Sequence, residues 1–113
     1  MLIPRINAIV SISRLEQSTA PPTVNAIRRA RSIAYFLDRN QFPIPFVFPT
    51  DEHGIQFEWK GDSRELNLEV PSTDEPLTFL TIVDGNPALE DRITANIETE
   101  IRRLIDWMLS AKV

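Results

Sequence analysis

The 113-residue chain has no cysteine, only one histidine and only three glycines. Without cysteine there is no disulfide framework, no thiol nucleophile and no zinc site built on thiolates. The absence fits a reducing cytosol, although it also permits export. Gly54, Gly61 and Gly85 all fall in expected turns, so the sequence offers no glycine-rich loop of the kind that cradles phosphates.

A long apolar run is also missing. No stretch approaches the ~20 apolar residues that a membrane helix requires. The N-terminal stretch MLIPRINAIVSISRLEQ is interrupted by Asn7 and by serines, and it lacks the basic start and the continuous apolar core of a signal peptide. We therefore expect a soluble, cytoplasmic protein with no membrane partner.

Charge is distributed unevenly along the chain. The net charge is −4, yet residues 1–42 hold six arginines and two acids, whereas residues 43–113 carry a net charge of −8. The acidic overall balance argues against general nucleic-acid binding, which depends on neutralising phosphates. The basic N-terminal third leaves room for a local exception.

Length and composition indicate one folded domain. A hydrophobic content of 42% and a charged content of 25% are typical of globular proteins. A chain of this length can bury one hydrophobic core without disulfides or bound metal. We expect residues 1–113 to form a single α+β domain, with residues 1–20 as an N-terminal segment whose attachment could be loose. The apolar residues of 2–15 fit either a helical stripe or an alternating strand, and we favour a short helix.

Two further helices are indicated, at about 23–40 and about 87–110. Thr23 follows a proline pair and is a suitable N-cap for the first helix, in which apolar residues recur at helical spacing. Asn86-Pro87 would start the second, with asparagine as N-cap and proline at the first helical position. The apolar stripe of this second helix covers about six turns and consists of Leu89, Ile93, Ile97, Ile101, Leu104, Ile105 and Met108.

The centre of the chain alternates between apolar and polar residues and predicts antiparallel strands. Residues 55–60 and 65–70 form a hairpin in which Trp59 faces Leu66, because this register pairs like with like on both faces. The stretch 44–50 contains two prolines and suits a sheet edge. Residues 77–84 are apolar on both faces and suit a more central position. We expect an antiparallel meander of three to four strands flanked by the two helices.

Catalytic and metal-binding chemistry finds little support in the sequence. His53 follows two acids, but adjacent residues in a turn rarely converge on one ion, so we expect no metal site and no cofactor. Glu58 and Glu69 share the polar face of the hairpin, where paired carboxylates could perform acid–base work. Any solvated sheet face has this appearance. We therefore assign no catalytic residue, and keep as the alternative a small hydrolase or nucleotide-modifying enzyme that uses Glu58, Glu69 and an arginine.

The helix at 23–40 carries Arg28, Arg29 and Arg31, with Arg39 beyond them. Arginine favours bidentate contacts with carboxylates and phosphates, which makes this helix a candidate docking face for an acidic partner or for nucleic acid. The alternative is a solvated helix surface that contacts the acidic second half of the same protein.

Trp107 and Met108, near the C-terminus, complete the partner-binding prediction. Trp59 shares a face with apolar hairpin residues and is expected in the core, whereas Trp107 lies beside the apolar stripe of the last helix. Together with their apolar neighbours, Trp107 and Met108 cover more than one helix face. This excess hints at a second packing surface for a dimer or another protein.

The chain resembles a widespread family of small uncharacterised bacterial proteins over about residues 20–70. The shared pattern is a proline pair before an alanine-rich helix, a proline-rich extended segment and a Gly-x-Gln-x-Glu-Trp strand. The resemblance implies no activity, because none is assigned to the family. Such proteins often carry Trp-Asp-Gly-x-Gly-Ala before the proline pair, where this chain reads LEQSTA (15–20), so any function of that piece would be absent or changed. The matching positions are Pro21, Pro22, Ala30, Pro45, Pro49, Gly54, Gln56, Glu58 and Trp59.

These observations favour a non-enzymatic module that binds another protein or a second copy of itself, in the manner of an antitoxin, an immunity protein, an adaptor or a chaperone. A nucleic-acid binder that uses the basic helix at 23–40 is a third candidate, after the enzyme. The predicted partner-binding residues are Arg28, Arg29, Arg31, Trp107 and Met108.

Overall fold

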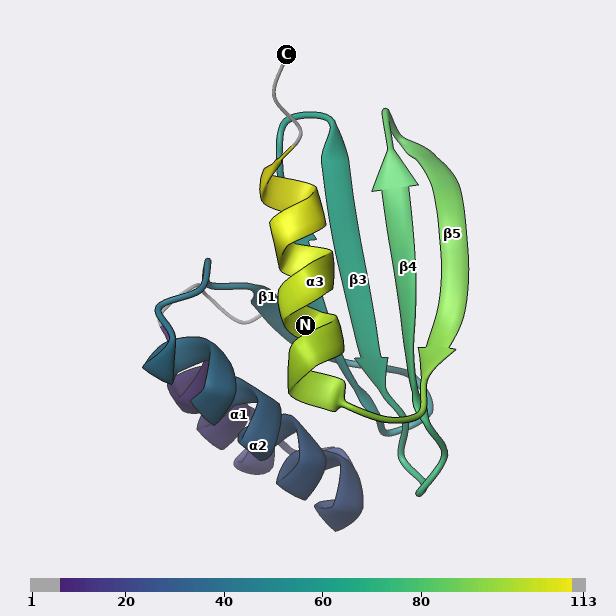
Figure 1. Ribbon diagram of the computed structural model, residues 1–113. Coiled ribbons are helices and arrows are strands. Elements are labelled where there is room, and N and C mark those ends of the chain that lie inside the picture. The colour runs from purple at the N-terminus through teal and green to yellow at the C-terminus, as the bar shows by residue number, and fades with distance from the viewer. Residues whose placement is uncertain (1–6, 111–113) are drawn as a thin grey trace.

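The structure, a computed structural model, describes residues 7–110 (Figure 1). Within that range it is an α+β fold in which two helices precede a meander of five antiparallel strands and a third helix follows it. The elements in chain order are α1 (Ala8–Glu16), α2 (Val24–Arg39), β1 (Phe46–Pro49), β2 (Ile55–Lys60), β3 (Arg64–Val70), β4 (Leu77–Val83), β5 (Asn86–Ile93) and α3 (Ile97–Leu109).

The sheet has the strand order β1-β2-β3-β4-β5, and the helices pack on one side of it. In Figure 1, α3 runs alongside β3 while α1 and α2 lie together near the β1 side of the sheet. Contacts of α1 with β1, of α2 with β2 and β3, and of α3 with β3 close a single core between the two layers. Among residues 7–110 no helix covers the opposite face of the sheet, towards which alternate side chains of each strand point.

The central hairpin has the predicted register. Trp59 pairs with Leu66, Phe57 with Leu68 and Ile55 with Val70. All six of these side chains are at most 2% exposed, because they point towards the helices, and the glutamates of the same strands point the other way. The indole of Trp59 also donates a hydrogen bond to the Pro43 carbonyl oxygen at 2.8 Å, so its polar atom is satisfied inside the core.

The first two helices expected from the sequence are both present in the structure. Thr23 accepts a hydrogen bond from the Ala26 amide at 3.2 Å, which confirms it as the N-cap of α2, and α2 ends at Arg39 with Asn40 as C-cap. The favoured helix in residues 2–15 is present as α1, which begins at Ala8; residues 2–6 lie outside the described residues. Along α1, Ala8, Ile12 and Leu15 are fully or almost fully buried in the core.

The prediction of a helix over 87–110 is wrong in its first third. Residues 86–93 form the fifth strand, and α3 begins only at Ile97. Asp84 and Gly85 both have positive φ angles, as a two-residue turn between antiparallel strands requires. This turn directs the next residues back along β4, so strand pairing overrides the local preference for a helix. The proline at position 87 is tolerated because β5 lies at the sheet edge.

The other strands lie where the sequence places them. β1, which ends at Pro49, is the opposite edge of the sheet, and β4 lies inside it between β3 and β5. Within residues 7–110, no helix is long and apolar enough to cross a membrane.

Candidate functional site

The outward side of α2 combines charge with exposed apolar surface. This helix buries the apolar face that includes Ala30, Ala34 and Leu37, which turns the residues between them towards solvent. Val24, Arg28, Arg31 and Tyr35 follow one another at spacings of four, three and four residues, so they form one row along the helix. Val24 is 83% exposed and Tyr35 is 58% exposed. Tyr35 is aromatic, yet its position in this row places it on the outward side of the helix.

Two cavities flank α2. A shallow depression of about 380 Å³ follows the row and is bordered by Glu16 of α1. A second cavity, of about 270 Å³, lies between α2 and α3 and includes Arg29 in its wall. Ser32 lines both cavities, so they adjoin across the helix. The three arginines predicted from the sequence therefore all border a hollow surface.

The three arginines differ in the ion pairs and hydrogen bonds that their side chains already form. Arg31 forms an ion pair with Glu16, and Arg29 donates to the Thr73 carbonyl oxygen at 3.0 Å. Arg28 donates only to the neutral side chain of Asn25 and forms no ion pair with any of residues 7–110. Arg28 and Arg29 both lack an ion pair among residues 7–110, and Arg28 is the more exposed of the two.

Loop 71–76 is tied to the start of α2. The Thr23 hydroxyl donates to the Ser72 carbonyl oxygen at 2.8 Å. The Asn25 amide nitrogen donates to the Thr73 carbonyl oxygen and to Asp74 Oδ1, both at 2.8 Å. The basic helix does contact the acidic second half of the chain, mainly through neutral groups, so part of the solvated-helix alternative is realised.

Trp107 and Met108 are placed away from the arginines. Both lie in the last turns of α3. Met108 is 5% exposed and Trp107 packs partly buried against the core. The apolar side chains that remain open at this end are Leu109, which is 50% exposed, and Ile44, which is 37% exposed. The structure does not join Trp107 and Met108 to the α2 surface.

Glu58 and Glu69 do not share a pocket. Glu58 borders a cavity of about 100 Å³ near Trp59 and Met108, and its carboxylate lies 3.8 Å from the Lys60 ammonium. Glu69 borders a different polar cavity of about 120 Å³ on the open face of the sheet. Glu58 and Glu69 thus line separate cavities, neither of which an arginine borders.

His53 lies in an exposed turn with a φ angle of 65°, and its carbonyl oxygen accepts the Thr23 amide at 3.0 Å. In the part of the chain that the structure describes, no group of three potential ligands could hold a metal ion. The role that the contacts assign to this turn is to anchor the start of α2.

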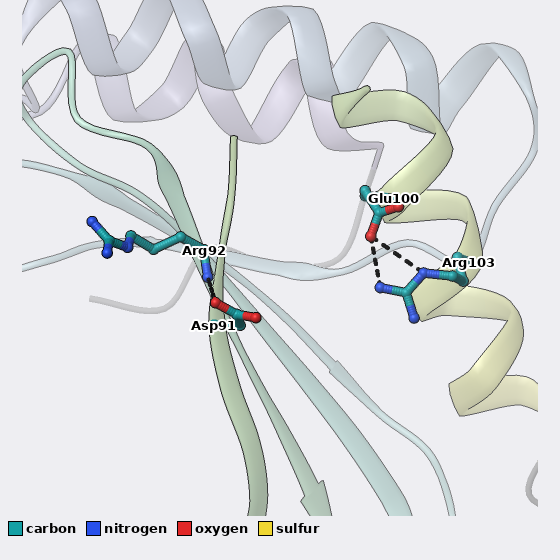
Figure 2. Close-up of polar contacts among 4 residues, drawn as sticks. All are labelled: Asp91, Arg92, Glu100 and Arg103. Carbon is teal, nitrogen blue, oxygen red and sulfur yellow. Dashed lines mark hydrogen bonds and ion pairs between the residues drawn. The ribbon is translucent and has the colours of Figure 1, made fainter. Parts of the chain in front are cut away.

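Two further polar pairs lie near α3 and β5 (Figure 2). Glu100 accepts from Arg103 at 2.6 and 3.2 Å, and Asp91 accepts from the backbone amide of Arg92 at 2.7 Å. Each pair joins residues close in sequence, and Figure 2 shows the two pairs standing apart. They stabilise their own segments and do not converge on a common point.

Comparison of the chain with protein-family models, with curated protein sequences and with solved structures gives no significant match. The resemblance over residues 20–70 therefore stays an expectation.

Proposed function

We propose that the protein is a non-enzymatic, cytoplasmic interaction module whose α2 surface binds an acidic, partly apolar segment of another protein. The observation that carries this proposal is the row on α2, in which an unpaired arginine stands between two exposed apolar side chains, Val24 and Tyr35. Arginine and tyrosine are both enriched among the residues that dominate the energy of protein interfaces.

The charge distribution of this protein favours a partner segment that is acidic. The basic row would attract carboxylates, and the strongly acidic second half of this chain would repel an acidic segment that approached elsewhere. Nucleic acid is a weaker fit, because Arg31 is already neutralised by Glu16 and the remaining cations do not form the extended basic track that phosphate binding uses.

The test measures binding of three fluorescein-labelled probes by fluorescence anisotropy: an acidic peptide of Glu, Asp and Leu, the same peptide with lysine in place of the acids, and a single-stranded oligonucleotide. We expect only the acidic peptide to bind. Arg28→Glu should weaken its binding by about tenfold or more, since a charge-assisted contact is replaced by repulsion. Tyr35→Ala should weaken it as well.

Arg92→Glu is the matched control. It makes the same exchange at an exposed arginine of β5 whose side chain, by strand alternation, points away from the helices. Its affinity should equal that of the wild type. Arg31→Glu is unsuitable, because it would place two glutamates together at the α1–α2 contact. Equal loss in Arg28→Glu and Arg92→Glu would refute the α2 site, and preference for the oligonucleotide would favour the nucleic-acid alternative.

A further inference from the structure

The cavity between α2 and α3 has an apolar floor. Its volume is about 270 Å³, and its floor is formed by Ile33, Phe36, Leu77 and Ile101, each at most 5% exposed. Ligand pockets for drug-sized molecules run from about 300 to 1,000 Å³. This cavity therefore suits a smaller ligand that buries one apolar group.

The walls of this cavity carry opposite charges that do not neutralise each other. Arg29 of α2 and Glu98 of α3 both line it, yet neither takes part in an ion pair among residues 7–110. Arg29 uses one donor on the Thr73 carbonyl oxygen, and a guanidinium has five N–H donors. A ligand in the cavity would thus meet both a cation and an anion.

The start of α3 reinforces the positive side. Ile97 and Glu98, the first two residues of α3, line the cavity. The N-cap residue, Asn96, has left-handed backbone angles and its side chain makes no capping hydrogen bond. The first-turn amides of α3 therefore lack a side-chain acceptor among residues 7–110, and the start of a helix carries a partial positive charge.

We propose that this cavity binds a free α-amino acid with an apolar side chain. The carboxylate is held by Arg29 and the first-turn amides of α3, the ammonium group by Glu98, and the side chain rests on the apolar floor. A simple carboxylate would leave Glu98 facing an anion, and an amine would leave Arg29 facing a cation. Only a zwitterion satisfies both walls. The proposal does not depend on the protein-binding function, which uses the other side of α2.

The test is a methyl NMR titration of the full-length protein with L-leucine and L-phenylalanine. We expect saturable shifts of the methyl groups of Ile33, Leu77 and Ile101, with a dissociation constant of about 1 mM or lower. Two analogues of phenylalanine isolate the head group: 3-phenylpropionate lacks the ammonium group, and phenethylamine lacks the carboxylate. Each should bind about tenfold more weakly, because one charge-assisted contact is lost.

Variants of the walls separate this site from the α2 row. Arg29→Gln and Glu98→Gln should each weaken amino-acid binding by about tenfold, whereas Arg28→Gln should leave it unchanged. Ile97→Trp, which fills the mouth, should abolish it without unfolding the protein. The proposal is overturned by the absence of saturable shifts, by equal binding of 3-phenylpropionate and phenylalanine, or by the acidic peptide shifting these same methyl groups when amino acids do not.

Discussion

Arg64 of β3 contacts Trp107 of α3 and so connects the end of the helix to the sheet. The guanidinium carbon of Arg64 lies 4.8 Å from the centroid of the Trp107 ring, and its Nη1 donates to the Trp107 carbonyl oxygen at 2.6 Å. One side chain at the start of β3 thus covers an aromatic face and satisfies a carbonyl in the last turn of the helix, where carbonyls lack intrahelical partners. This contact covers one face of the Trp107 ring.

Arg64→Ala should lower the free energy of unfolding by about 1–2 kcal/mol, because it removes a charge-assisted hydrogen bond and a cation–π contact together. Arg64→Lys should recover only part of the loss, since an ammonium cannot stack and donate as a planar guanidinium does. Urea unfolding followed by tryptophan fluorescence measures both. The matching truncation Arg92→Ala, at an exposed position, should change stability by less than about 0.5 kcal/mol. Equal losses at the two positions would contradict the assigned role of Arg64.

Asp38 caps α1 from 30 residues away. Its two carboxylate oxygens accept the Ala8 amide at 3.1 Å and the Ile9 amide at 3.0 Å. Asp38→Ala should therefore lower the free energy of unfolding by about 1–2 kcal/mol, because two first-turn amides lose an acceptor and the positive helix end loses its anion. Asp38→Asn should lose less, since its amide oxygen can still accept one of the two bonds. Thermal unfolding measures the difference.

The control for this prediction is Asp106→Ala, which removes an exposed acid from the last turns of α3, where a negative charge opposes the helix dipole. Its effect should be neutral or slightly stabilising. A loss as large as that of Asp38→Ala would mean that the cap on α1 contributes nothing specific.

Residues 89 and 93 distinguish a strand from a helix in the segment 86–93. Ile93 is 4% exposed and pairs with Leu77, whereas Leu89 is 53% exposed. Ile93→Asn should cost about 2–4 kcal/mol, because it leaves a polar group and a cavity in the core, and Leu89→Asn should cost less than about 1 kcal/mol. On a continuous helix the two residues would share one stripe and cost similar amounts. Urea unfolding of the two variants decides between these outcomes.

The site was only partly accessible to sequence reasoning. The cluster of arginines can be read from the sequence. The exposure of Val24 and Tyr35 could be recognised only once the buried face of α2 was known. Met108 was assigned to a partner surface, although α3 turns it into the core. The cavity lined by Arg29 and Glu98 lies between two helices that are separated in the sequence by all five strands. No local sequence pattern could therefore predict it.

The amino-acid sequence alone determined the features whose energy comes from residues a few positions apart. The Thr23 cap, the end of α2 near Asn40 and the register that places Trp59 against Leu66 all follow from local hydrogen bonding and from alternation. Each can be inferred before anything is known of the remaining chain.

Tertiary structure decided the rest, because the energies concerned belong to groups distant in the chain. Residues 86–93 carry a helical apolar spacing, yet pairing with β4 across the Asp84-Gly85 turn makes them a strand. Asp38 caps α1, and Arg29 and Glu98 line one cavity, only because separate helices pack together on one sheet.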